Sequence, residues 1–255
     1  MTFDEILSVS LQQSAIDLNC FPEDLVSGKN RVVISKANPL ARKYLTLPFA
    51  CNLVSYGGNI VASVSPQFHS AASAYISRFS AWSCFETPNL HILSEAVEPL
   101  GHRICFMAEY FLPVPEKLLT AECPFKTKFL TQKDFSPLYT PEWSNALCAK
   151  RPELDEFGIG AFDGEKLVGL AACSADCYSM RQIGIDVLPE YRRLGIASAL
   201  TGRLAAEVLV RGKVPFYCAA WSNIRSVRNA LKSGFVPAWV EMTVKEKAFA
   251  DELIR

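Results

Sequence analysis

The sequence predicts an α+β fold in two domains. We expect a mixed, mostly antiparallel sheet flanked by helices in the C-terminal part, and an α/β domain before it. Asp163-Gly164 stands between two apolar segments, which is typical of a tight hairpin between antiparallel strands. After residue 182, strand-like and helix-like patterns alternate. With 255 residues, half of them hydrophobic, the chain is long enough for two cores.

The N-terminal part mixes helical and extended patterns. Apolar periodicity predicts an amphipathic helix first, and apolar runs between polar clusters predict short strands. In chain order we expect a helix over residues 3–18, strands over 31–34 and 59–64, helices over 66–79 and 90–100 (ended by Gly101), and a strand over 104–108. The order over residues 59–111 also loosely echoes the C-terminal part. A degenerate second copy of that fold is therefore an alternative to an unrelated α/β domain.

Prolines are dense between residues 113 and 141 and disfavour regular structure there. We therefore place the connection between the domains in this stretch, with domains over residues 1–120 and 121–255. The N-terminal domain is expected to cover the acceptor site and to select the acceptor.

The C-terminal part has clearer signals. Strands are expected over 158–162 and 166–172, on either side of the hairpin turn, and over 182–188, where Pro189 ends the strand. A helix over 195–211 carries an apolar stripe that includes Leu200, Leu204 and Val208. A strand over 214–221, a helix over 224–233 and a strand over 236–244 complete the domain.

The turn Arg192-Arg193-Leu194-Gly195-Ile196-Ala197 lies where a strand gives way to a helix. A helix start has unpaired N–H groups and the positive end of the helix dipole. Small residues at 195 and 197 would let a phosphate group approach the backbone closely. By itself the turn is more typical of an ordinary charged loop.

With its neighbours, this turn resembles the GNAT superfamily of N-acetyltransferases. The family signature, Gln/Arg-x-x-Gly-x-Gly/Ala after a strand, is matched by Arg192 to Ala197 following Pro189-Glu190-Tyr191. A second block of the family is matched by Asn223-Ile224-Arg225-Ser226 and Lys232-Ser233-Gly234-Phe235. The resemblance covers about residues 125–245. It implies acetyl-CoA as co-substrate and transfer of the acetyl group to an amine.

The resemblance also implies cofactor contacts. The strand carrying Ile185 and Val187 would pair with the pantetheine arm. The strand over 214–221 would diverge from that neighbouring strand and open a slot for the thioester. The turn and helix start would hold the diphosphate, and two residues of the second block would contact the arm. The implied cofactor residues are Ile185, Val187, Arg192, Arg193, Leu194, Gly195, Ile196, Ala197, Ser198, Asn223 and Ser226. Asn223 is equally a natural helix N-cap. Contact of Arg225 and Arg228 with the 3′-phosphate of the cofactor is one interpretation, but solvated helix charges are the more typical one.

The chain departs from the family at its catalytic positions. The tyrosine that often protonates the departing thiolate is replaced by Ala230, and Arg181 stands near the usual glutamate base. By residue type, Asp186 and Glu156 are candidate bases and Tyr217 is a candidate acid. Both carboxylates are also typical surface or structural groups. A non-catalytic acyl-CoA-binding regulatory module is therefore the alternative to an enzyme.

Composition narrows the partners. Lys+Arg and Asp+Glu are both 26, which gives no general attraction to nucleic acid or an anionic membrane. Nine scattered cysteines without a CxxC motif, and three separated histidines, indicate no metal site. We expect reduced thiols in a cytoplasmic protein, with no secretory signal or membrane span. The acceptor, a small-molecule or peptide amine, and the oligomeric state are left open.

Overall fold

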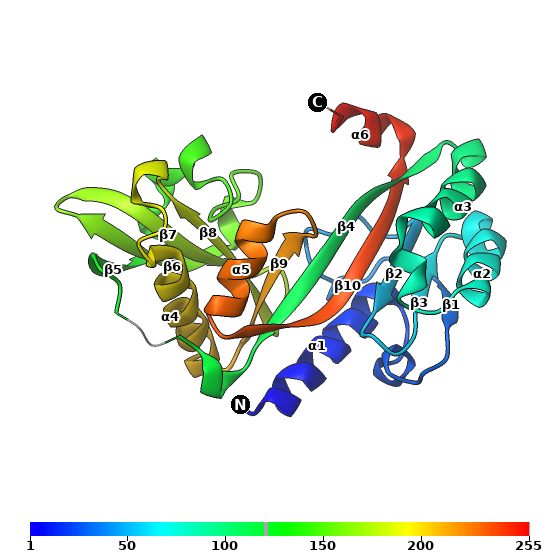
Figure 1. The fold of residues 1–255 in the computed structure, drawn as a ribbon, viewed down its shortest axis with the longest axis horizontal. Coiled ribbons are helices and arrows are strands. Elements are labelled where there is room, and N and C mark those ends of the chain that lie inside the picture. Colours follow the sequence, from blue (N-terminus) through cyan, green and yellow to red (C-terminus); the bar gives the residue numbers. More distant parts are fainter. Residues whose placement is uncertain (120–121, 255) are drawn as a thin grey trace. The chain divides into compact units, whose positions relative to one another are not determined.

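The computed structural model describes residues 1–119 and 122–254 (Figure 1). By internal contacts the chain divides into unit 1, Met1–Val9 with Phe111–Pro237, and unit 2, Ser10–Tyr110 with Ala238–Arg255. The predicted boundary between residues 120 and 121 lies outside the described residues. A single boundary does not reproduce these units, because the long strands β4 (His102–Pro113) and β10 (Phe235–Glu246) each have residues in both.

Unit 1 contains a mixed, mostly antiparallel sheet, which confirms the predicted class. Its strands follow the order β9-β8-β7-β6-β5, and only the β8–β9 pair is parallel among those registered in this sheet. The strands are β5 (Lys126–Thr131), β6 (Asp155–Asp163), β7 (Lys166–Ser174), β8 (Met180–Val187) and β9 (Val214–Ala220). The helices are α4 (Ile196–Val210) and α5 (Ile224–Lys232).

The predicted hairpin is present between β6 and β7. Asp163 pairs with Lys166, and Gly164 between them has a φ of 60°, a conformation that costs glycine little. On one face of the sheet, α4 buries its apolar stripe against β6, β7 and β8. Leu200 and Leu204 are both fully buried there. Burial of this stripe drives the helix onto the sheet.

β5 lies inside the stretch where the prolines predicted only a connection. It pairs antiparallel with β6, from Lys126–Phe162 to Thr131–Phe157. Its residues are largely exposed or half-buried, which suits an edge strand. Because Lys126, Lys128 and two threonines interrupt its apolar residues, the pattern carried little strand signal.

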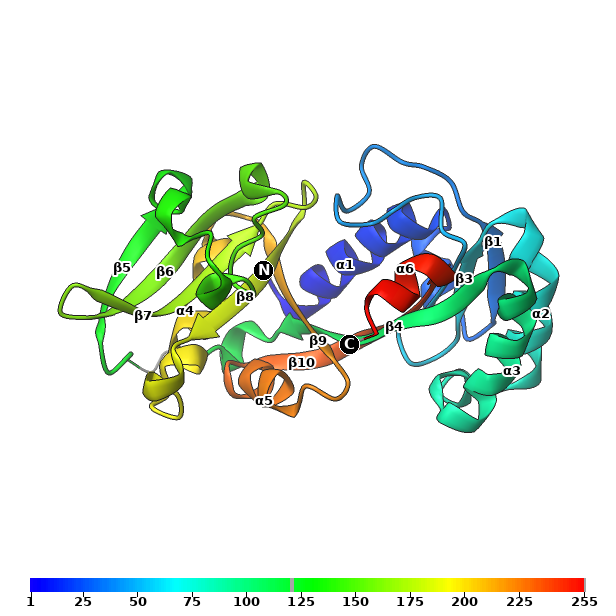
Figure 2. The same ribbon diagram turned by 90° about the horizontal axis from the view of Figure 1, so that it is seen from above.

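In unit 2 the strands follow the order β1-β3-β2-β10-β4, and Figure 2 labels β1, β3 and β4 among them. β1 pairs parallel to β3, whereas β2 pairs antiparallel to both β3 and β10. Besides β4 and β10, its strands are β1 (Arg31–Ile34), β2 (Cys51–Ser55) and β3 (Val61–Val64). The remaining helices of the chain are α1 (Phe3–Leu18), α2 (His69–Arg78), α3 (Thr87–Val97) and α6 (Lys247–Glu252).

The strand β2 was not predicted, although it is buried along its whole length. Its alternate residues face opposite sides of the sheet. Cys51 and Leu53 pack into the core with α2 and α3, while Asn52 and Val54 face a pocket that also includes Leu18 of α1. A strand covered on both faces shows no alternation of polar and apolar residues, so its sequence signal is weak.

Among the helices of residues 1–119 and 122–254, none has the length and apolar character needed to cross a membrane.

Candidate active site

β8 and β9 run parallel but pair over only part of their length. Their registered pairs run from Met180–Val214 to Gln182–Phe216. β8 then continues to Val187 and β9 to Ala220. Beyond Gln182, the backbone groups on this side of β8 are not engaged by β9. In unit 1 this opening is a place where an extended ligand could pair with a strand edge.

β8 leads into the turn that the sequence analysis singled out. Residues Pro189–Tyr191 form a short 3₁₀ turn, and α4 begins at Ile196 with Gly195 as its N-cap. Gly195 has a φ of 87°, and a Cβ added to it would meet nothing within 4 Å. Arg193 also has a positive φ, of 66°. The first N–H groups of α4 thus follow an open turn, where an anion meets unpaired donors.

One basic side chain of the turn is held by a backbone contact. The Arg192 Nε donates a hydrogen bond to the backbone oxygen of Val187 at 3.0 Å, which holds this arginine along the end of β8. The turn from Arg192 to Leu194 is exposed to solvent. Its positive charge is therefore accessible to a phosphate group, and the helix dipole adds to it.

The start of α4 is firmly seated. Ile196 is 1% exposed, and a Cβ added to Gly169 on β7 would lie 2.6 Å from its Cγ2. Ser198 donates from its hydroxyl to the Gly195 oxygen at 3.1 Å. The absence of a side chain at residue 169 therefore lets the helix start approach the sheet closely, so that its N–H groups have a fixed position.

The carboxylate of Asp186 holds a neighbouring segment. It accepts hydrogen bonds from the backbone N–H of Asn145 (2.8 Å), the Asn145 side-chain amide (2.7 Å) and the backbone N–H of Ala146 (3.0 Å). A Cβ added to Gly184 would lie 2.0 Å from the Asn145 backbone oxygen. Asp186, which lies on β8, therefore has structural partners in Asn145 and Ala146, whatever part it takes in chemistry.

Glu156 has a partner as well. Its Oε2 accepts from the Arg181 Nε at 2.5 Å, and Arg181 is largely buried. The Arg181 Nη1 also donates to the backbone oxygens of Cys177, Tyr178 and Met180, at 3.0, 3.3 and 2.9 Å. The arginine that stands near the usual glutamate position thus ties the segment before β8 to Glu156.

Tyr217 lies in the core beneath α5. Its side chain is 3% exposed, and its hydroxyl lies 2.7 Å from the Ser226 hydroxyl. Burial raises the pKa of Tyr217, against the effect of hydrogen bonds with Ser226 and Asn229. Asn223 caps α5, because its side-chain oxygen accepts from the backbone N–H of Ser226 at 3.2 Å.

The interior of this corner is closed by small and aromatic residues. Ala230, where the family often has a tyrosine, is fully buried in the same core as Tyr217 and Phe235. The Asn229 side-chain amide donates to the Thr201 hydroxyl on α4 at 3.1 Å. The polar groups between α4, α5 and β9 therefore form one connected set.

Residues 119–238 match the family model described as GNAT acetyltransferase. This stretch contains the open turn, the start of α4 and the capped start of α5. Residues 119–238 form a GNAT acetyltransferase domain.

Several solved structures are similar to the chain at low sequence identity. A putative GNAT-family acetyltransferase from Novosphingobium aromaticivorans is 19% identical, with a TM-score of 0.44, over 56% of this chain and 66% of that one. A GCN5-related N-acetyltransferase-like protein from Streptococcus suis is 21% identical, with a TM-score of 0.46, over 60% and 68%. A putative acetyltransferase from Salmonella typhimurium, solved with acetyl-CoA, is 14% identical, with a TM-score of 0.35, over 48% and 93%.

This chain spans about two thirds of the length of the Novosphingobium and Streptococcus proteins. Among curated proteins, none matched.

The GNAT domain brings the predicted cofactor residues to three neighbouring places. They are the end of β8 (Ile185, Val187), the turn and first residues of α4 (Arg192, Arg193, Leu194, Gly195, Ile196, Ala197, Ser198), and the start of α5 (Asn223, Ser226). The side chains of Ile185 and Val187 are half-buried and pack against the core under α4, so a ligand paired with this strand would use their backbone. Ser198 is buried, and it too would contribute its backbone.

The two faces of the sheet separate the predicted catalytic residues. Tyr217 packs into the core with Ile183 on the α4 side. Asp186 bonds to Asn145 in the segment before β6, which packs through Leu147 against the opposite face. Asp186 and Tyr217 therefore lie on opposite faces of the sheet, near the place where β8 and β9 cease to pair.

Sequence reasoning missed Asn145, Thr201 and Asn229. Asn145 lies just after the proline-rich stretch, where no element was predicted, and nothing in its surroundings indicated a contact with β8. Thr201 and Asn229 each lie within a predicted helix, where a polar residue is usually solvated. Their spacing from the motif residues by whole helical turns, Thr201 from Ala197 and Asn229 from Ser226, is a signal that could have identified them.

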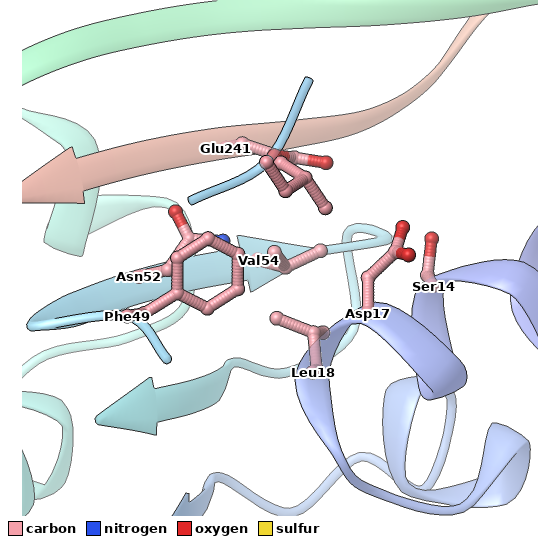
Figure 3. Close-up of a pocket in the computed structure, with 8 residues that line it drawn as sticks. Ser14, Asp17, Leu18, Phe49, Asn52, Val54 and Glu241 are labelled. Atoms are coloured by element: carbon pink, nitrogen blue, oxygen red, sulfur yellow. The ribbon is translucent and has the colours of Figure 1, made fainter. Parts of the chain in front are cut away.

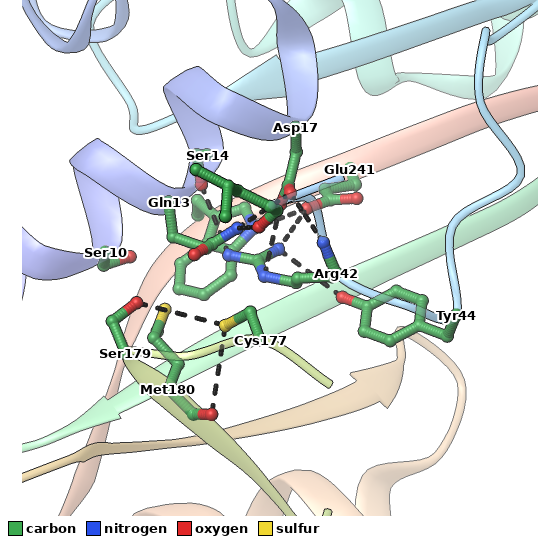
Figure 4. Close-up of polar contacts among 12 residues, drawn as sticks. Ser10, Gln13, Ser14, Asp17, Arg42, Tyr44, Cys177, Ser179, Met180 and Glu241 are labelled. Carbon is green, nitrogen blue, oxygen red and sulfur yellow. Dashed lines mark hydrogen bonds and ion pairs between the residues drawn. The ribbon is translucent and has the colours of Figure 1, made fainter. Parts of the chain in front are cut away.

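Unit 2 contains a buried polar network that the sequence did not predict (Figure 4). Its centre is Arg42, 2% exposed, which lies 3.3 Å from an Asp17 oxygen and 3.5 Å from a Glu241 oxygen. The Arg42 guanidinium also lies 5.2 Å from the Trp239 ring centroid. One cation thus faces two carboxylates inside a core, where the dielectric response is weak.

One face of α1 completes this network. The hydroxyls of Ser10 and Ser14 lie 2.7 and 2.8 Å from the Tyr56 hydroxyl, and Gln13 donates to Asp17 at 3.0 Å. These α1 residues recur at helical spacing and are all buried. Polar residues at core positions are tolerated because each has a partner.

Next to this network is a small pocket of unit 2 (Figure 3). Asp17, Ser14, Glu241 and Asn52 supply its polar atoms. The other lining residues are Leu18, Leu45, Phe49 and Val54. The pocket has lining residues from α1, β2 and β10.

Proposed function

We propose that this protein is an acetyl-CoA-dependent N-acetyltransferase that transfers the acetyl group directly to a primary amine held beside it. The observation that carries the proposal is the open turn at Gly195 before the seated N-terminus of α4, within the GNAT domain. A diphosphate needs unpaired N–H donors and no side chain in its way, and this turn offers both. The residues present therefore fit the cofactor that the family uses.

In this proposal each part of the site has one task. The N–H groups from Arg193 to Ser198 bind the diphosphate, and Asn223 and Ser226 contact the arm of the co-substrate. The backbone at Ile185 and Val187 pairs with that arm. Positioning of amine and thioester supplies much of the rate, because both are held in one geometry.

Proton transfer needs a group on each side of the opening. Asp186 and Glu156 are the carboxylates proposed to take a proton from the attacking amine, and the hydroxyl pair of Tyr217 and Ser226 is proposed to lie on the sulfur side. The contact between Asp186 and Asn145 orients that carboxylate on β8. The ion pair with Arg181 likewise orients the carboxylate of Glu156, near the start of β6.

Acetyl-CoA is expected to stabilise the protein against heat. A ligand that binds only the folded state adds about 2.7 kcal/mol to the free energy of unfolding at about 100 times its Kd. The melting temperature, followed by circular dichroism or differential scanning fluorimetry, should therefore rise with acetyl-CoA concentration, whereas adenosine alone should have little effect. An unchanged melting temperature at millimolar acetyl-CoA would rule the proposal out.

Removing the base should lower turnover. With any amine that releases thiol from acetyl-CoA, Asp186→Asn or Glu156→Gln is expected to reduce kcat by about 10²–10⁴-fold if that carboxylate is the base. The asparagine keeps the shape of the side chain, so the melting temperature reports any structural part separately. If kcat survives both changes, neither carboxylate is the base.

A second candidate, a non-catalytic acyl-CoA-binding regulatory module, is favoured by one observation. Both candidate carboxylates are already engaged by neighbouring groups, and Ala230 closes the position of the usual acid. The two candidates differ in thiol release. Acetyl-CoA that stabilises the protein without releasing thiol across a broad panel of amines would support the binding module.

A further inference from the structure

The GNAT domain has no hydroxyl at residue 230 to meet the departing sulfur, because this residue is Ala230, but two hydroxyls lie elsewhere on β9 and α5. Ser226 lies on the first turn of α5 and is half-buried. Tyr217 lies behind it in the core, with the two hydroxyls 2.7 Å apart. Of the two, only Ser226 is accessible from outside the core.

Either hydroxyl could donate in this contact, and the acidity of the two groups favours one direction. A phenol is a stronger acid than an aliphatic hydroxyl, so the better donor of the pair is Tyr217. Burial raises the pKa of Tyr217, which keeps its proton in place. When Tyr217 donates to the Ser226 oxygen, the serine O–H is directed away from the core and stays available to a ligand.

Two further contacts hold the pair. Asn223, the N-cap of α5, accepts from the Ser226 backbone N–H and sets the first turn of the helix. Asn229 bonds to Thr201 on α4, which fixes α5 at its other side. The serine therefore has one preferred orientation before any ligand arrives, which is the preorganisation that charge stabilisation needs.

Resting on the proposed function, we propose that the Ser226 hydroxyl donates a hydrogen bond to the sulfur of the departing thiol, and that Tyr217 positions it. The amine nitrogen forms a bond to the acetyl carbon, and the electron pair of the C–S bond goes to sulfur. The nitrogen loses one proton to a base or water, and the sulfur gains one from water. The serine hydroxyl ends as it began, so Ser226 is a catalytic residue and Tyr217 a positioning residue.

The proposal can be tested with coenzyme A itself, without knowing the acceptor. A donor at the sulfur binds the thiolate better than the thiol, so coenzyme A should bind more tightly as pH rises through the thiol pKa, about 8.5 for a free thiol. Desulfo-coenzyme A lacks the sulfur and reports every other pH effect. The titratable groups that raise the pKa of Tyr217 by their charge are Cys218 on β9 and Asp186 on β8. Both are present when either coenzyme A or desulfo-coenzyme A is titrated, so their effect cancels in the comparison.

Binding is measured by isothermal titration calorimetry between about pH 6.5 and about pH 9.5. For the unchanged protein, the Kd of coenzyme A relative to desulfo-coenzyme A should fall about tenfold across this range. Ser226→Ala should remove this fall, Ser226→Thr should retain it, and Tyr217→Phe should reduce it. Cys218→Ala is the matched control on the neighbouring strand and should leave it intact.

The outcomes separate the two proposals. If neither coenzyme A nor desulfo-coenzyme A binds, the proposed function fails, and this inference with it. If both bind with the same pH response, or if Ser226→Ala keeps the fall while still binding desulfo-coenzyme A, only the role of Ser226 is overturned. A fall lost in Cys218→Ala instead would overturn it in favour of the cysteine.

Discussion

Replacing Gly195 by glutamate is expected to abolish acetyl-CoA binding. The side chain would occupy the open space of the turn and place a carboxylate where the diphosphate is proposed to bind. Two like charges at hydrogen-bond distance, added to the loss of the close backbone approach, should weaken binding by at least about 10³-fold. The measurement is the Kd of acetyl-CoA by calorimetry, together with the loss of its thermal stabilisation.

The control for this change lies at the other end of α4. Gly212 also has a positive φ, of 70°, and open space around a Cβ, so Gly212→Glu imposes similar backbone strain and the same charge. We expect it to lower stability by about 1 kcal/mol and to leave the Kd within about twofold of the unchanged protein. If Gly195→Glu and Gly212→Glu bound acetyl-CoA equally well, the diphosphate would not lie at the start of α4.

Replacing Arg42 by methionine is expected to be the most destabilising single change in unit 2. It would leave Asp17 and Glu241 buried without their cation, and breaking a buried pair costs about 3–5 kcal/mol. The cation–π contact with Trp239 would also be lost. Urea denaturation at neutral pH measures the change in the free energy of unfolding.

The pH dependence of this loss follows from the carboxylates. Burial raises the pKa of Asp17 and of Glu241, while Arg42 lowers both. A carboxyl whose pKa is raised on folding favours the native state at low pH, and this contribution is lost as pH rises through the folded pKa. Without Arg42 the folded pKa values rise further, so the deficit should be largest near about pH 7 and shrink towards about pH 4.

A surface arginine of the same unit is the control. Arg103 pairs with Glu98 and Asp251, both well exposed. Arg103→Met should cost no more than about 1 kcal/mol and show little pH dependence, since exposed ion pairs contribute little. Equal losses for the two arginines, at every pH, would show that the Arg42 network does not stabilise unit 2 as a buried charge cluster.

Local sequence determined most elements of the fold. Glycines with positive φ at residues 164 and 101 end a strand and a helix where the sequence predicts, because only glycine adopts that conformation at low cost. The apolar stripe of α4 and the asparagine cap of α5 were likewise readable from spacing alone. These features depend on neighbours within a few residues, so the chain encodes them directly.

The fully buried strand β2 and the edge strand β5 were not predicted from the sequence, for opposite reasons. Burial on both faces removes the alternation that identifies a strand, and a polar edge strand has too few apolar residues to show one. The sequence also did not predict that each unit consists of two segments of the chain, because β4 and β10 are long enough to contribute residues to both units.

The motif residues from Arg192 to Ala197 were identifiable from sequence because the helix start and its glycine are adjacent in the chain. The partners of Asp186, Arg181 and Tyr217 were not, nor were those of Arg42. Each of these groups meets residues from other elements, 9 to 199 positions away, and only the packed chain brings them together. A contact between distant segments is determined by which faces are buried, and that choice belongs to the tertiary structure.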